Sequence, residues 1–250
     1  MLTSLNIRAV NTALDSENRI HEDSIAAEYG FRGGLVPGVT VYGYMASAAI
    51  DRLGLDWLTR GAMDVRFFMP FFDGEAVEMT VVPAENDRVK IDASTRATAT
   101  AWIDGSRLTE NDPIAAPLGD RVAASRETIR PGVVLGAIEK TLDLSEPQVS
   151  APLDAFIGSE RLAHPAILLS LANEILMRNV VLGPWIHSSS EVRNFTPARD
   201  GETLHVLAKI EDAYEKKGHE FAVLDVAIMC GDRLVCRVRH TVIWQLRRPS

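Results

Sequence analysis

The sequence predicts an α+β protein made of two copies of one unit, each with a long buried helix and an antiparallel sheet. An internal repeat is the first observation behind this prediction. Residues 65–75 match residues 192–202 at seven of eleven positions, with an offset of 127. A repeat of this length indicates that one structural unit occurs twice. The second observation is that each copy begins with an apolar segment of helical length and continues with alternating strands.

The helices are predicted over Val39 to Leu53 in the first unit and Ala166 to Val181 in the second. The first segment is apolar nearly all round, which is typical of a helix covered by a sheet. Pro165 suits the first turn of the second helix, where its missing N–H is not needed.

The strands are indicated by alternation and by turn signals. Apolar and polar residues alternate over 204–210, and turn residues occur at 73–74, 104–105, 217–218 and 231–232. This pattern predicts antiparallel strands in a meander. Residues 111–135 are rich in proline and charge, so they are expected to link a unit at 1–125 to a unit at 126–250.

Composition excludes several classes of function. The net charge of −8 argues against nucleic acid, since phosphate contacts need lysine and arginine clusters. We expect a cytoplasmic protein that does not enter a membrane, because no signal segment or long apolar run occurs. No Cys/His spacing suggests zinc, so no metal and no cofactor are expected. Cys230 and Cys236 are expected to be free thiols.

Residues 15–45 hold a histidine, nearby carboxylates and a glycine turn that leads into the first helix. This stretch resembles the signature of the MaoC-like dehydratase/hydratase family, in which Asn, an aliphatic residue, His and Asp precede Gly-Phe and a helix-opening glycine. The positions that fit are Asn18, Ile20, His21, Asp23, Ala27, Gly30, Phe31 and Gly38.

The resemblance implies a hot-dog fold, and two copies imply a double hot-dog, in which one chain forms a pseudo-dimer. It also implies a hydro-lyase that acts on an acyl thioester by (R)-specific hydration of a 2-enoyl-CoA. Coenzyme A or acyl carrier protein would carry the substrate, and pairing into a homodimer stays open. At offsets of 127 to 129, the counterpart of His21 falls at 148–150, where no histidine occurs.

The family roles transfer residue by residue. His21 would be the general acid and base, Gly38 N–H would polarise the thioester carbonyl, and Asn18 would orient the site. The slot of the family aspartate, five residues before the histidine, holds Ser16. Asp15 or Glu17 would replace it if a bulge re-aimed the chain; otherwise Ser16 would hold water and His21 would act alone.

Further residues are expected at the substrate or in the core. The residues expected to contact substrate are Ser16, Glu17, Gly34, Val36 and Tyr42. Asp23 is expected to cap the helix that follows it. His164 stands before the second helix and is a weaker candidate for the site. His187 is expected to have a structural or subunit-contact role, and His240 follows the buried parity of its strand.

Two other functions remain open from the sequence. An acyl-CoA thioesterase on the same scaffold would use Asp15, Glu17 or Asp23 as its carboxylate. A non-catalytic acyl-CoA-binding protein would explain a displaced aspartate and a second unit without the histidine.

Overall fold

A computed structural model describes residues 3–104, 114–145 and 161–248 of the chain. Within these residues a ten-stranded antiparallel sheet dominates, in the order β1-β3-β4-β5-β2-β9-β12-β11-β10-β7. The strands are β1 Thr3–Arg8, β2 Gly61–Phe67, β3 Ala76–Pro83, β4 Val89–Ala93, β5 Ala97–Ile103, β7 Val134–Thr141, β9 Ile186–Asn194, β10 Thr203–Lys216, β11 His219–Cys230 and β12 Arg233–Gln245.

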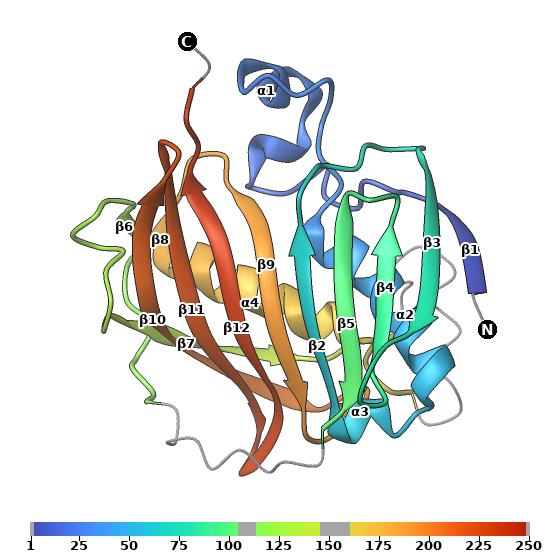
Figure 1. Cartoon of the computed structure of the whole chain (residues 1–250). Helices are drawn as coiled ribbons and strands as arrows, with labels where there is room; N and C mark the ends of the chain where they lie inside the picture. Colours follow the sequence, from blue (N-terminus) through green and yellow to red (C-terminus); the bar gives the residue numbers. More distant parts are fainter. Residues whose placement is uncertain (1–2, 105–113, 146–160, 249–250) are drawn as a thin grey trace.

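Two long helices, α2 (Gly38–Leu53) and α4 (Pro165–Asn179), lie behind the sheet in Figure 1 and pack against each other. The helix prediction is accurate to within two residues at each end, and the α+β class is confirmed. The shorter helices are η1 (Arg19–His21), α1 (Asp23–Glu28) and α3 (Trp57–Arg60). In Figure 1, α1 lies beyond one end of the sheet.

The sheet has the same strand order on both sides of its centre. β2 pairs with β9 in the middle, and four further strands follow outward from each of them in matching order. The repeated Asp-Gly-Glu segments also match in detail. Gly74 and Gly201 have φ of 74° and 78°, and their N–H groups donate to Ala9 and Leu142 carbonyls at 2.8 and 2.9 Å. The sequence repeat therefore folds into two equivalent substructures.

The turn prediction at 73–74 needs correction. β2 pairs with β5 and β9, whereas β3 pairs with β1 and β4, so this turn does not join neighbouring strands. Residues 68–75 instead cross the end of the sheet. The predicted turns at 217–218 and 231–232 do connect paired strands. Gly105 and the expected counterpart of His21 at 148–150 lie outside the described residues.

The segment that was predicted as a linker packs on the second half. β6 (Val122–Ala123) pairs in parallel with β8 (Val180–Val181), and Ala116 forms a bridge to Gly136. β7 begins at Val134, so the predicted linker overlaps its first residues. Cys230 and Cys236 are free thiols. None of the helices in the described part of the chain is long and apolar enough to cross a membrane.

Candidate functional site

The short helix η1 places His21 between the two halves of the molecule. Its N-terminus is capped by Asn18, whose side chain accepts from Ile20 N–H. The buried Asn18 amide also forms two hydrogen bonds with the backbone of Trp185, from Nδ2 to O at 2.9 Å and from Trp185 N to Oδ1 at 3.1 Å. Asn18 therefore fixes the histidine segment against the start of β9 in the second half.

The backbone fixes the tautomer of His21. Nδ1 lies 2.6 Å from the Leu35 carbonyl oxygen, which can only accept, so Nδ1 carries the proton. In the neutral ring Nε2 then carries the lone pair, which accepts a hydrogen bond from Asn18 Nδ2 at 3.5 Å. Burial lowers the pKa of His21, and the Leu35 carbonyl partly opposes that shift. At neutral pH the imidazole is therefore neutral, and Nε2 is its basic nitrogen.

The glycine loop supports the histidine rather than the substrate. A Cβ on Gly34 would lie 2.0 Å from the His21 carbonyl oxygen, so only glycine fits against this backbone. Gly34 N–H donates to Asp23 Oδ1 at 2.7 Å. Asp23 is the first residue of α1, and Glu22 occupies the cap position. The expectation that Asp23 caps this helix is wrong, because its carboxylate closes the loop instead.

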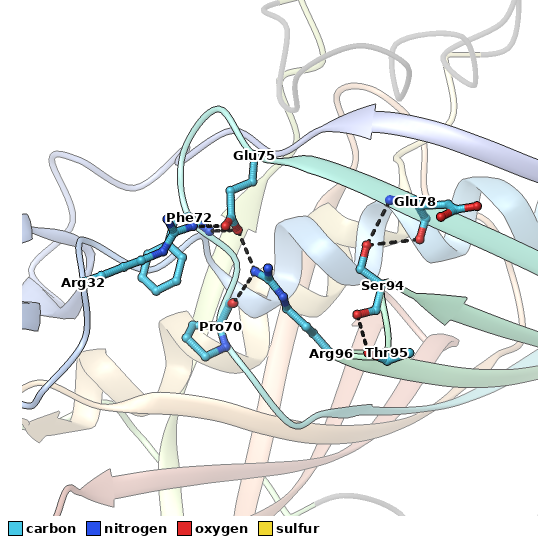
Figure 2. Close-up of polar contacts among 8 residues, drawn as sticks. All are labelled: Arg32, Pro70, Phe72, Glu75, Glu78, Ser94, Thr95 and Arg96. Carbon is cyan, nitrogen blue, oxygen red and sulfur yellow. Dashed lines mark hydrogen bonds and ion pairs between the residues drawn. The ribbon is translucent and has the colours of Figure 1, made fainter.

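An ion-pair network fixes the far end of the same loop (Figure 2). Glu75 lies between two arginines, Arg32 from the loop and Arg96 at the start of β5. Arg96 Nη1 is 2.7 Å from Glu75 and also donates to the Pro70 carbonyl at 3.1 Å. Arg32 lies over the Phe72 ring at 4.3 Å. The network ties the histidine segment to the crossing segment 68–75.

Two cavities meet at His21. The first cavity, of about 540 Å³, is called the polar cavity because it is the more polar of the two. Its lining mixes apolar residues such as Val39, Ile167 and Met177 with the polar residues Ser16, Thr40, Lys140, Asp143, Ser170 and Glu174. The apolar cavity, of about 260 Å³, has lining residues that include Phe31, Val41, Phe67, Phe71, Ile186 and Ile243. Both cavities are lined by Asn18, His21, Pro37, Asn173 and Trp185. A ligand that extended from one cavity into the other would therefore lie against His21.

Some residues predicted for the site line these cavities. Ser16 lies on the polar cavity, and Val36 and Gly38 lie on the apolar one. Gly38 begins α2, so its N–H has no partner inside the helix. The structure thus brings Asn18, His21 and Gly38 to one place.

The other predicted residues do not line either cavity. Asp15 is exposed in a turn. Glu17 is also exposed, and its carboxylate pairs with Arg121 at 3.0 Å. No bulge re-aims either carboxylate toward His21. Gly34 packs on the backbone, and Tyr42 is fully buried with its hydroxyl group unpartnered among the described residues.

Helix α4 and the residue before β9 contribute cavity residues that were not predicted from the sequence. Asn173 lies on both cavities, and its Oδ1 is buried without a hydrogen-bond partner in the described part of the chain. Glu174 lies on the polar cavity and Trp185 on both. The sequence shows that Asn173 and Glu174 lie on a helix, but which helical residues point toward the cavities depends on how α4 packs on α2.

The remaining histidines near the helices have different surroundings. His164 is the N-cap of α4: Nδ1 accepts from Ala166 N–H at 3.1 Å, and Nε2 contacts Ser47 Oγ at 3.1 Å. Burial lowers its pKa to about 4. His187 is buried and lines the apolar cavity. Within the described ranges no group of three His, Cys, Asp or Glu is arranged to hold a metal ion.

No protein-family model matches the chain, and no curated protein sequence matches it. Solved structures do match over the full length. A putative MaoC domain dehydratase from Chloroflexus aurantiacus has a TM-score of 0.68 at 12% identity, covering 99% of this chain and 95% of that one. A Mycobacterium tuberculosis protein described as a double hotdog fold has a TM-score of 0.59 at 15% identity, covering 97% and 95%.

A putative oleoyl thioesterase from Lactobacillus plantarum is also similar, with a TM-score of 0.55 at 12% identity and coverage of 99% and 98%. Identities this low concern the fold alone. The resemblance predicted from residues 15–45 is confirmed at that level: the structural neighbours of this chain are MaoC-like dehydratases and double hot-dog proteins, over its full length.

Proposed function

We propose that this protein is a double hot-dog enzyme that hydrates a 2-enoyl thioester, with His21 as the general acid and base. The observation that supports this most is the state of His21. Its Nδ1–H is held by the Leu35 carbonyl at 2.6 Å, which leaves Nε2 as the basic nitrogen of a residue that lines both cavities. A positioned base that is neutral near physiological pH is what water activation needs.

The two cavities suit the two parts of an acyl thioester. The polar cavity would hold the amide-rich arm of coenzyme A or of acyl carrier protein, and the apolar cavity would hold the acyl chain. The thioester would then lie between them, beside Gly38, whose N–H would polarise its carbonyl. In this proposal residues 1–125 carry the reactive groups, and residues 126–250 supply walls through Asn173 and Trp185.

The reaction would use one histidine in both proton transfers. His21 Nε2 takes a proton from water as the water oxygen bonds to the β-carbon. The electron pair of the double bond moves onto the carbonyl oxygen as an enolate, which Gly38 N–H stabilises. The protonated His21 then returns the proton to the α-carbon. Ser16, in the slot of the family aspartate and on the polar cavity, would hold the water.

Crotonyl-CoA hydration tests this proposal directly. Loss of the enoyl ultraviolet absorbance is expected with the wild-type protein and is expected to disappear in His21→Ala. The matched control is His205→Ala, because His205 lies on β10 outside both cavities. Equal hydration by the two variants would refute the role of His21. Binding of acyl-CoA without turnover, unchanged in His21→Ala, would identify a binding protein instead.

A thioesterase is the second candidate, and Glu174 favours it. This carboxylate lies on the polar cavity together with His21, where neither Asp15 nor Glu17 reaches. A thioesterase would use it to activate water against the thioester carbonyl. Release of free thiol from butyryl-CoA, lost in Glu174→Gln, would support this function. A flat thiol trace alongside crotonyl-CoA hydration would eliminate it.

A further inference from the structure

A buried chain of three side chains leads from the core of the second half to the start of α2. His187 Nε2 is 2.8 Å from Ser190 Oγ, and Ser190 Oγ is 2.9 Å from His240 Nδ1. The two imidazole rings are 4.3 Å apart between centroids. His187 and Ser190 are on β9, and His240 is on β12, so the sheet fixes the spacing.

The His187 end of this row of three hydrogen-bonded side chains lies at the apolar cavity, next to Gly38. His187 is 6% exposed and lines that cavity, and its Nδ1 has no hydrogen-bond partner among the described residues. A Cβ on Gly38 would be 2.7 Å from His187 Nδ1. The edge contact with the Phe67 ring, 4.8 Å between centroids, packs the imidazole further.

Counting hydrogen-bond donors and acceptors indicates which nitrogens of His187 and His240 carry the protons. Ser190 has one hydroxyl proton, so one histidine accepts it and the other donates to the oxygen. If Ser190 donates to His240, the unpaired N–H is His240 Nε2, which is fully buried and without a partner in the described structure. If Ser190 donates to His187, the unpaired N–H is His187 Nδ1. This nitrogen is also buried and without a partner in the described structure, but its residue lines the apolar cavity, where a bound ligand would satisfy it. An unsatisfied buried donor is costly, so a ligand bound in the apolar cavity favours the second arrangement.

We propose that His187 Nδ1–H is a second hydrogen-bond donor to the carbonyl oxygen of the acyl thioester, acting beside Gly38 N–H. This inference rests on the proposed function and adds a specific residue to it. Two donors from different halves of the chain would then converge on the oxygen that gains charge in the enolate. Ser190 and His240 are positioning residues, because they set which nitrogen of His187 carries the proton.

The surroundings keep this donor neutral. Burial is the main cause that lowers the pKa of His187 well below its ordinary value; His240 lowers it further, and the backbone of Ser189 opposes the shift. Burial also lowers the pKa of His240 to about 3. His187 therefore polarises the carbonyl without giving up a proton, and His21 remains the group that exchanges protons.

The tautomer is measured on full-length wild-type protein saturated with butyryl-CoA, by ¹⁵N NMR of the imidazole nitrogens. His187→Asn removes the signal and so assigns it. We expect the Nδ1-protonated form for both His187 and His240. A His187 protonated at Nε2 would overturn the proposal whatever the protein catalyses. Ser190→Ala is expected to mix the tautomers, and Ser190→Thr, which keeps the hydroxyl, is expected to restore one.

The contact with substrate is measured by the infrared band of the ¹³C-labelled carbonyl of bound butyryl-CoA, which cannot be hydrated. Wild-type protein is expected to lower the frequency of this band. His187→Asn places an amide near Nδ1 and is expected to keep most of the shift. His187→Gln places its amide near Nε2, so it is expected to lose part of the shift and about 100-fold in kcat for crotonyl-CoA, with KM little changed.

The outcomes separate the two proposals. Wild-type protein that does not bind butyryl-CoA would refute the acyl-thioester function, and with it the carbonyl as the partner of His187. Wild-type binding with the same carbonyl frequency in His187→Gln would leave the function standing and overturn only the second donor.

Discussion

The beginnings of α2 and α4 occupy equivalent places in the two halves but differ in what they offer a ligand. The backbone before each helix is the same. Val36 N–H donates to the Phe71 carbonyl at 2.8 Å, and Ala163 N–H donates to the Ala198 carbonyl at 2.8 Å. The next residues differ: Pro37-Gly38 opens α2, and His164-Pro165 opens α4.

These two residues decide whether the helix start is open. At α4, Pro165 has no N–H, and the His164 side chain accepts from Ala166 N–H. At α2, no side chain caps the helix, and Gly38 lies on the apolar cavity. The positive end of a helix attracts developing negative charge only where its N–H groups are free. The two halves therefore share one fold, but the start of α2 is open to a ligand, whereas the start of α4 is capped by the side chain of His164.

Substituting the first helical residue is expected to have the largest effect. In Gly38→Ala the new Cβ would press on His187 Nδ1, 2.7 Å away, so both proposed donors would move. We expect crotonyl-CoA hydration to fall about 100-fold, as when one oxyanion donor is lost. The loss is measured as kcat from the decay of enoyl absorbance.

Pro165→Ala is the matched control, because it changes the equivalent residue of α4. It should keep wild-type turnover and alter the free energy of unfolding by less than about 1 kcal/mol. Wild-type kcat in Gly38→Ala would mean that the carbonyl does not bind at the start of α2.

Acid is expected to destabilise the fold through its buried histidines. The pKa is about 4 for His164 and about 3 for His240, both lowered by burial. Below about pH 6.5 these two histidines are protonated in the unfolded chain but stay neutral in the folded protein. The free energy of unfolding should therefore fall as pH drops, by about 1.4 kcal/mol per pH unit for each, until pH 4 for His164 and pH 3 for His240.

Urea unfolding followed by tryptophan fluorescence at pH 7, 6 and 5 measures this slope. In the variant His164→Ala the free energy of unfolding should change less steeply with pH than in the wild type, by about 1.4 kcal/mol per pH unit. Unfolding free energies that stay constant over this range would contradict the neutral, buried state of these rings.

Removing the cap of α4 separates stability from activity. His164→Ala leaves Ala166 N–H unpaired and opens a small void, which should cost about 2 kcal/mol. For a chain of this size, that corresponds to a lower Tm by about 5 °C. Turnover by the remaining folded protein should be unchanged, because His164 lies on neither cavity. Loss of kcat without loss of Tm would place His164 in the site.

Much of the fold could be predicted because the repeat and the helices are local patterns. Identical residues 127 positions apart revealed two copies, and apolar runs marked α2 and α4 to within two residues. The order of the strands around β2 could not be predicted from such local patterns. Asp73-Gly74 has the residues of a hairpin turn, but the chain uses the same positive φ to cross the end of the sheet.

The candidate site was predictable only where its residues are close in sequence. Asn18, His21 and Gly38 lie within one segment that folds back on itself, so a motif could identify them. Asn173 reaches both cavities because α4 stacks on α2, and His187 reaches the apolar cavity because β9 pairs with β2. Such contacts between halves leave no spacing pattern in the sequence.

The smallest expected effect concerns the loop that holds the histidine segment. Glu75 binds Arg32 and Arg96, whereas its counterpart Glu202 binds Arg233 in the second half (Figure 2 shows the Glu75 network). Glu75→Gln removes the charge from this pairing and should loosen the segment that carries His21. We expect kcat/KM for crotonyl-CoA to fall only a few-fold, because partly exposed ion pairs contribute about 1 kcal/mol or less.

Glu202→Gln provides the comparison, since it weakens the ion pair of the counterpart glutamate, which lies away from both cavities. It should lower stability by a similar small amount and leave kcat/KM unchanged. High salt should reduce the difference between wild type and Glu75→Gln, because it screens the ion pair in the wild type. If both variants lose activity equally, the loss comes from general stability, and the two halves contribute alike to holding the site.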